Sequence, residues 1–240
     1  MQSYLPELMK HIEHIFFDLD HTLWDFDANS KETLKELFVM NELQNEIKHD
    51  SIFVKTYKEI NAKYWDRYNH GKVSKEELRL GRFRDTFVKL NIVKNESFIE
   101  KMAEDYLRIC PTKPNLIEGS IEILDFLKDR YALHIITNGF IDPTERKISS
   151  SGIGKYFETI TSSEEVGVNK PHPPVFLKSM EKANAKPLES AMIGDNLKAD
   201  IIGAINTQMT PVLFREGKVR SNPKYYHVQG LLELKSLFEK

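Results

Sequence analysis

Short segments typical of strands recur along the chain, and most of them are apolar runs bounded by polar residues or by a turn. They cover residues 14–18, 132–137, 157–162, 191–194 and 210–214. Continuous apolar runs of this length predict buried strands. Segments with helical spacing lie between the later runs, roughly at residues 120–129, 142–151, 173–184 and 198–206. Strands that alternate with helices predict an α/β fold with a parallel sheet and helices on both faces. The first strand must join that sheet, because an isolated strand cannot satisfy its edges.

The segment between the first two strands, residues 24–110, has a different texture. Its apolar and aromatic residues recur at helical spacing, which predicts the core of a helical bundle rather than a cofactor site. Asn29 or Ser30 can cap its first helix, and Ser74 and Glu77 form a capping-box pattern ahead of a later one. This insertion leaves from the carboxyl end of the first strand, where open parallel sheets place their ligand sites. We therefore expect it to act as a lid.

Composition and charge narrow the class of protein. The chain has 240 residues, of which 40% are hydrophobic and 29% charged, which predicts a globular protein of one or two domains. The formal net charge of −2 predicts no nucleic acid polymer and no anionic membrane as partner. No apolar run approaches a membrane span, residues 1–14 lack a signal-peptide core, and the single cysteine, Cys110, allows no intrachain disulfide. We expect a cytoplasmic protein.

Two carboxylates stand where the first strand ends. Side chains alternate along a strand, so Asp18 and Asp20 begin on the same face and repel one another unless a cation lies beside them. Mg²⁺ prefers such oxygen ligands, and a carboxylate held next to it can attack phosphorus. The pair therefore predicts a metal-assisted phosphoryl-transfer site. The alternative is an Asp-rich turn whose carboxylates bond to backbone amides.

Polar residues also follow three later strands or loops. Thr137 offers a hydroxyl to a phosphate oxygen, and the residues after it offer backbone amides. Lys170 precedes a proline, and Asp195 with Asp200 follows a buried strand and could complete a metal site. Taken singly, each has an ordinary explanation: a common turn, a solvated lysine and an aspartate that caps a helix.

The order of these elements resembles the haloacid dehalogenase (HAD) superfamily of hydrolases. Four motifs follow one another along the whole chain: an Asp-x-Asp-x-Thr strand end, a strand-terminal Thr, a Lys-Pro and a Gly-Asp-x-x-x-x-Asp. The helical insertion resembles the C1-type cap of that superfamily. Residues 69–71, 80–83, 136–140 and 163–167 resemble its pyrimidine 5′-nucleotidase branch. The resemblance implies a Rossmann-like catalytic core of residues 1–23 and 111–240, with a helical cap at 24–110.

The resemblance also implies a role for each motif residue. Asp18 would be the nucleophile that becomes phosphorylated, and Asp20 would protonate the leaving alcohol and then activate water. The phosphoryl oxygens would be held by Thr137, Asn138 and Lys170. Mg²⁺ would be bound by Asp18, the backbone carbonyl of Asp20, and Asp195, with Asp200 supporting these ligands. Two further residues, Trp24 and Arg82, could contact the substrate by stacking on a base or by pairing with a phosphate or sugar.

We therefore expect a Mg²⁺-dependent phosphatase, a monomer or homodimer, that hydrolyses small phosphorylated metabolites through an aspartyl-phosphate intermediate. The resemblance favours nucleoside 5′-monophosphates. A sugar phosphomutase would use the same core residues and stays open as an alternative. A 2-haloacid dehalogenase is disfavoured because Asp20 and Asp195 are both present, and a non-catalytic regulatory protein because no catalytic position is substituted.

Overall fold

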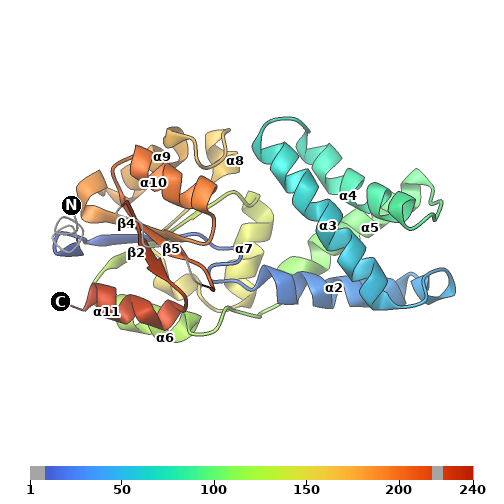
Figure 1. Ribbon diagram of the computed structural model, residues 1–240, viewed down its shortest axis with the longest axis horizontal. Helices are drawn as coiled ribbons and strands as arrows, with labels where there is room; N and C mark the ends of the chain where they lie inside the picture. Colours follow the sequence, from blue (N-terminus) through green and yellow to red (C-terminus); the bar gives the residue numbers. More distant parts are fainter. Residues whose placement is uncertain (1–8, 218–223, 240) are drawn as a thin grey trace. The chain divides into compact units, whose positions relative to one another are not determined.

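The computed structural model describes residues 9–217 and 224–239. The sequence-based prediction that residues 1–14 lack a signal-peptide core therefore falls in part, at residues 1–8, outside the described residues. The chain divides into two compact units (Figure 1). Unit 1 comprises Met1–Phe26 and Pro114–Lys240, and unit 2 comprises Asp27–Lys113. Their functional assignment as catalytic core and cap stays a prediction. Within the described ranges, no helix is both long and apolar enough to cross a bilayer.

Unit 1 is built on a sheet of six described strands, all parallel, in the order β3-β2-β1-β4-β5-β6. The first strand lies in the middle, since His14 pairs with Ala132 on one side and Ser190 on the other. This confirms the predicted α/β fold and the place of the first strand in the sheet. The strands are β1 (His14–Phe17), β2 (Ala132–Thr137), β3 (Thr159–Ser162), β4 (Ser190–Gly194), β5 (Thr210–Phe214) and β6 (Tyr226–Val228).

Helices cover both faces of this sheet. Figure 1 shows α9 (Pro173–Ala183) and α10 (Gly203–Asn206) on one face, and α6 (Ser120–Leu127) and α11 (Leu234–Phe238) on the other. Phe16 and Met192 of the sheet pack against Phe176 of α9 in one buried apolar cluster, which fixes this helix over the central strands. The remaining elements of unit 1 are α7 (Ile141–Ser150), α8 (Ser163–Val166), a π-helix (Leu197–Ile202) and 3₁₀ turns at Gly154–Tyr156, Pro187–Glu189 and Leu231–Glu233.

Unit 2 is helical throughout. Rings from different helices meet in its centre, and Tyr57, Phe83 and Tyr106 lie within 4.8–5.7 Å of one another between ring centres. This confirms that the aromatic stripes form a helical core. The helices are α2 (Phe26–Met40), which begins at the end of unit 1, α3 (Asp50–Asn69), α4 (Lys75–Lys89) and α5 (Glu96–Ile109), with 3₁₀ turns at Leu43–Asn45 and Cys110–Thr112.

The two predicted helix caps fared differently. Ser74 does cap α4, since its Oγ accepts a hydrogen bond from the Glu77 N–H at 3.0 Å. The prediction that Asn29 or Ser30 caps α2 was wrong, because the helix begins at Phe26 and both residues are buried inside it. Ser30 instead accepts a hydrogen bond from the Tyr106 hydroxyl at 2.8 Å, so its polar group serves the contact with α5.

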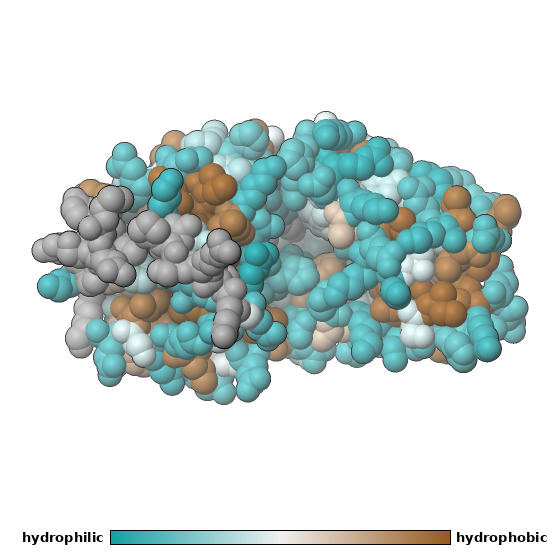
Figure 2. Space-filling model, in the orientation of Figure 1, coloured by the Kyte–Doolittle hydropathy of each residue, from teal (hydrophilic) through white to brown (hydrophobic). Residues whose placement is uncertain are grey.

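The visible surface is mainly hydrophilic, with apolar side chains gathered in several places, one of them over part of the helical unit (Figure 2). Val39, Val88 and Val93 are the most exposed large apolar residues of unit 2, and Val93 is 95% exposed.

Candidate active site

The end of β1 is placed by its neighbour β4. The Asp18 N–H donates to the Ile193 carbonyl at 2.9 Å, which extends the strand pairing by one residue and leaves the Asp18 side chain at the carboxyl edge of the sheet. The chain then turns back, because the Leu19 carbonyl accepts the N–H groups of Leu23 at 3.0 Å and Trp24 at 2.8 Å. Asp18 and Asp20 are therefore carried by a short, internally hydrogen-bonded loop.

Three carboxylates converge at this edge. Asp18, Asp195 and Asp200 each offer an oxygen, and these oxygens lie within 4.8 Å of one another. Asp195 follows β4, and Asp200 belongs to the π-helix that begins two residues later. Asn196, not Asp195, caps that helix by accepting the N–H groups of residues 198 and 199, so the helix-cap alternative for Asp195 was wrong. The carboxylate of Asp195 is thus not used as a cap.

Lys170 neutralises part of this cluster. Its Nζ lies 2.6 Å from Asp18 Oδ1, 2.7 Å from Asp200 Oδ1 and 2.8 Å from the Ile136 carbonyl oxygen. Three acceptors match the three protons of the ammonium group. The main chain of Lys170 is held by Asn138, whose Oδ1 accepts the Lys170 N–H at 2.8 Å and whose Nδ2 donates to the Lys170 carbonyl at 3.3 Å. The lysine is therefore fixed at both ends.

Burial dominates the electrostatics of these groups. It raises the pKa of Asp18 to about 6, although Lys170 opposes the shift. Burial, reinforced by the charge of Asp18, also raises the pKa of Asp195 to about 6. Burial raises the pKa of Asp200 despite its contact with Lys170. Burial alone would lower the pKa of Lys170, but the two carboxylates raise it above its usual value. The single lysine therefore does not offset the cost of burying these three carboxylates.

Asp20 is not part of the group of three carboxylates. Both of its oxygens contact Lys147 Nζ, at 2.6 Å and 2.8 Å. Lys147 lies on the buried side of α7, and its Nζ lies 4.6 Å from the centre of the Trp24 ring. The Asp20 carboxylate is thus separated from the cluster and has its own cation.

The end of β2 lies beside Asp20. A Cβ added to Gly139 would be 3.2 Å from Thr137 Oγ1 and 3.7 Å from Asp20 Oδ2. Thr137 is buried, and its Oγ1 accepts the Gly139 N–H at 2.9 Å. The structure therefore brings the predicted core residues together at the carboxyl ends of β1, β2 and β4; these residues are Asp18, Asp20, Thr137, Asn138, Lys170, Asp195 and Asp200.

The two predicted substrate contacts are interior side chains. Trp24 is fully buried beneath Lys147. Arg82 is 4% exposed within unit 2, where its Nη1 donates to Asn61 Oδ1 at 3.0 Å and its guanidinium lies 4.9 Å from the Tyr106 ring centre. Packing accounts for both side chains, and their contact with substrate stays a prediction.

Sequence reasoning gave no role to two polar residues of the site, of which the first, Thr22, is the threonine of the Asp-x-Asp-x-Thr strand end. Thr22 Oγ1 lies 3.5 Å from Asp18 Oδ2 and 3.4 Å from Asp195 Oδ1, and it accepts the Asp195 N–H at 3.2 Å. Lys147 is the second. Its only sequence signal is a lysine that shares the buried face of a helix with Thr144 and Ile148, where a charge is costly unless it is paired.

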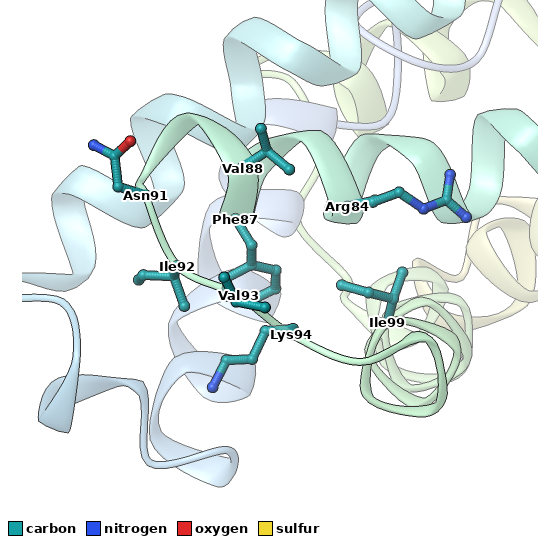
Figure 3. Close-up of a pocket in the computed structure, with 8 residues that line it drawn as sticks. All are labelled: Arg84, Phe87, Val88, Asn91, Ile92, Val93, Lys94 and Ile99. Carbon is teal, nitrogen blue, oxygen red and sulfur yellow. The ribbon is translucent and has the colours of Figure 1, made fainter.

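A separate hollow of about 360 Å³ lies in unit 2 (Figure 3). Apolar side chains such as Phe87, Val93 and Ile99 form most of its lining. Its two cations are already paired, Arg84 with Glu77 and Glu96, and Lys94 with Glu46. This hollow lacks the acidic groups that the cluster in unit 1 provides.

The donor set of the cluster fits a magnesium ion. All three groups are carboxylates, the hard oxygen ligands that Mg²⁺ prefers. A divalent cation would also offset the mutual repulsion of these carboxylates, which adds to the larger effect of burial in raising the pKa of Asp18 and Asp195.

Comparisons with known proteins place this geometry in a family. The sequence model of the family of haloacid dehalogenase-like hydrolases matches residues 12–206 of this chain. Pyrimidine 5′-nucleotidase YjjG of Escherichia coli (strain K12) is 33% identical over 196 residues, which cover 80% of this chain and 81% of that protein. Glyceraldehyde 3-phosphate phosphatase of Pyrococcus furiosus is 31% identical over 216 residues, which cover 88% of this chain and 83% of that protein.

A solved structure shares the whole fold. The crystal structure of YfnB from Bacillus subtilis, which is bound to magnesium and reveals interdomain movement, superposes with a TM-score of 0.83 at 25% identity. The match covers 95% of this chain and 99% of that one.

Proposed function

The chain belongs to the haloacid dehalogenase-like hydrolases, and on that premise we propose that it is a magnesium-dependent phosphatase that hydrolyses nucleoside 5′-monophosphates. The membership confirms the resemblance drawn from the motifs. The observation that carries the proposal is the buried Asp18 carboxylate, held by Lys170 within a cluster of three carboxylates at the edge of the sheet. That arrangement supplies a nucleophile, a fixed cation and a metal-ligand set at one point.

The reaction has two balanced halves. In the first, a carboxylate oxygen of Asp18 bonds to phosphorus while the bond from phosphorus to the leaving alcohol breaks, and Asp20 gives its proton to that alcohol. In the second, water attacks phosphorus, Asp20 takes the proton of that water, and the bond from Asp18 to phosphorus breaks. The separation of the Asp20 carboxylate from the cluster supports this division of roles.

The remaining residues hold this arrangement. Lys170 fixes Asp18 and offsets its charge, and its three protons have acceptors in Asp18, Asp200 and the Ile136 carbonyl. Thr137 lies beside Asp20, where its hydroxyl can meet a phosphoryl oxygen. Asp18 and Asp195, with the carbonyl of Asp20, would hold Mg²⁺, which when bound neutralises charge on the phosphoryl oxygens.

The preference for nucleotides rests on similarity. The segments that resemble the pyrimidine 5′-nucleotidase branch and the 33% identity to YjjG both favour it. A triose phosphate is a second candidate, because the glyceraldehyde 3-phosphate phosphatase is 31% identical over a similar share of the chain.

A panel of phosphate esters tests the proposal. We expect release of inorganic phosphate from UMP, CMP and dTMP in the presence of Mg²⁺, with lower kcat/KM for AMP and glyceraldehyde 3-phosphate. EDTA should abolish release and added Mg²⁺ restore it. Asp18→Asn should remove turnover, because an amide is a poor nucleophile, while circular dichroism shows an intact fold.

Each outcome of these measurements tests a different part of the proposed function. Activity that survives exhaustive chelation would contradict the metal role, and turnover by Asp18→Asn would contradict the nucleophile. Equal kcat/KM across the panel would remove the nucleotide preference and leave the phosphatase. Conversion of a sugar phosphate to its isomer without phosphate release would favour the phosphomutase instead.

A further inference from the structure

Asp20 forms an ion pair with Lys147, a residue that does not belong to the family motifs. Lys147 Nζ contacts both carboxylate oxygens, at 2.6 Å and 2.8 Å. Contacts from one ammonium group to both oxygens direct the carboxylate toward Lys147 and restrain its position, which a single hydrogen bond would do less well. The Lys147 side chain is 8% exposed and that of Asp20 is 24% exposed, so water competes little for this pair.

Lys147 is itself fixed by the loop that carries Asp20. Its Nζ lies 4.6 Å from the Trp24 ring centre and 5.8 Å from the Phe26 ring centre, which is the geometry of a cation–π contact. The backbones of Asp20 and Trp24 form an isolated parallel β-bridge, and the His21 N–H donates to the Trp24 carbonyl at 3.0 Å. Helix α7 therefore holds the loop through the carboxylate and through the indole together.

Proton transfer depends on this alignment. A carboxyl group that gives or takes a proton must lie within hydrogen-bond reach of its partner atom with the right orientation. A carboxylate free to rotate spends much of its time misaligned, and each misaligned state lowers the rate without changing how the phosphoryl group binds.

We propose that Lys147 is a positioning residue that fixes the orientation of the Asp20 carboxylate for proton transfer, first with the leaving alcohol and then with water. The inference rests on the proposed role of Asp20 as acid and base. Lys147 acts through Asp20 and has no need to touch the substrate. Its burial, which is costly for a lysine, is explained by this task.

A double-mutant cycle tests the proposal with a nucleoside monophosphate that the enzyme hydrolyses. Lys147→Met keeps the length of the side chain but removes the charge, and it should lower kcat about tenfold or more. KM for the substrate and the Mg²⁺ concentration for half-maximal activity should stay near wild type. In an Asp20→Asn background, Lys147→Met should change kcat by less than about twofold, because the group on which it acts is gone.

Three further variants and one further substrate sharpen the test. Lys147→Arg keeps a cation that can engage both oxygens and lie on the rings, so it should restore most of kcat. With 4-nitrophenyl phosphate, whose leaving group needs no proton, Lys147→Met should keep the pre-steady-state burst of nitrophenolate while steady turnover falls.

Lys128→Met is the matched control: the Lys128 Nζ lies 2.7 Å from Asp125 Oδ1 and 5.7 Å from the Tyr156 ring centre, and kcat should not change. Should Lys147→Met fail to fold, Lys147→Gln takes its place in the cycle.

The outcomes separate this inference from the proposed function. Full activity of Asp20→Asn would contradict the role of Asp20 itself. If Asp20→Asn has a lowered kcat, and adding Lys147→Met lowers that kcat a further tenfold, the lysine acts independently of Asp20. That result would overturn the positioning role. Loss of substrate or Mg²⁺ binding in Lys147→Met, with kcat unchanged, would overturn it as well.

Discussion

Gly194 shows how tightly single residues are set at the site. A Cβ at this last position of β4 would lie 2.3 Å from Asp200 Oδ2 and 2.4 Å from its Cγ, closer than non-bonded atoms can approach. The carboxylate of Asp200 therefore occupies the space that any other side chain would need. Because Asp200 contacts Lys170, which contacts Asp18, the absence of one carbon at Gly194 sets the place of Asp18, the proposed nucleophile.

Gly194→Ala should therefore damage activity more than stability. We expect kcat to fall by about tenfold to a hundredfold, since a shift of about 1 Å at a reacting group is costly. The free energy of unfolding should fall by only about 1–3 kcal/mol, the usual cost of overpacking. Phosphate release and urea unfolding measure the two effects. Gly154→Ala is the control, because its Cβ would meet a single methyl group of Ile148 at 3.1 Å; a wild-type rate for Gly194→Ala would contradict the argument.

Residue identity alone reveals some of the site and not the rest. Asp18, Thr137 and Asp195 could be found because each follows a recognisable strand. Lys147 could not, since it stands inside a helix and its meaning depends on a carboxylate far away in the chain. A pairing of that kind is a property of the tertiary structure, so no local pattern contains it.

At the scale of elements, a pair of histidines joins β1 to β2. His134 is fully buried, its Nε2 lies 3.1 Å from His14 Nδ1, and its Nδ1 lies 2.9 Å from Thr159 Oγ1. Burial, with the nearby His14, lowers the pKa of His134 from 6.5 to about 4. The folded state therefore holds this imidazole neutral in a range where the unfolded chain protonates it.

The sign of the resulting pH dependence follows. The contribution of His134 to the free energy of unfolding is complete above pH 6.5 and is lost as the pH falls toward 4, by about 1–3 kcal/mol. Asp18 and Asp195 have raised pKa values and act in the opposite direction between about pH 4 and 6. Comparison with His134→Gln isolates the histidine: between pH 4 and 6.5 the free energy of unfolding of the wild type relative to the variant, measured with urea, should increase with pH. An unchanged dependence would show that His134 does not titrate in this range.

The elements themselves were predictable to the extent that their patterns are local. Residues 132–137 and 210–214 were expected as strands, and both occur with those bounds. β6 was missed because Tyr226–Val228 is short and contains a histidine, so it becomes a strand only through pairing with β5. The start of α2 was misplaced for a related reason: the polar side chain of Ser30 bonds to α5, a contact that no pattern within α2 contains.

On the scale of the whole molecule, unit 2 has its own core. Phe53 and Tyr57 of α3 contact rings of α4, and Arg82 lies among the rings of Tyr57 and Tyr106. The unit is one uninterrupted stretch, Asp27–Lys113, whereas unit 1 is assembled from two stretches. A stretch with its own buried core can in principle fold alone, although its small size makes it marginal.

We therefore expect residues 27–113, produced alone, to be helical by circular dichroism and to unfold in one cooperative thermal transition. Mg²⁺ should leave its midpoint unchanged but raise that of the full chain, because the carboxylate cluster belongs to unit 1.

Two variants of the fragment serve as controls. Phe53→Ala removes a fully buried ring and should cost about 3–5 kcal/mol, enough to abolish the transition, whereas Val93→Ala, at a fully solvated position, should leave it in place. A fragment without cooperative unfolding would show that unit 2 depends on the rest of the chain.

The central place of β1 in the sheet has a consequence for synthesis on the ribosome. β1 precedes unit 2 in the chain, whereas its neighbours β2 and β4 follow unit 2 and are made only after it has been completed. The nascent chain must therefore carry an apolar, unpaired strand while the helical unit forms behind it, and the sheet closes late through contacts between distant segments. During that interval the strand is open to association with other chains. Asp18 gains its full set of neighbours only once Asp200 has emerged, because Lys170 bridges the two carboxylates.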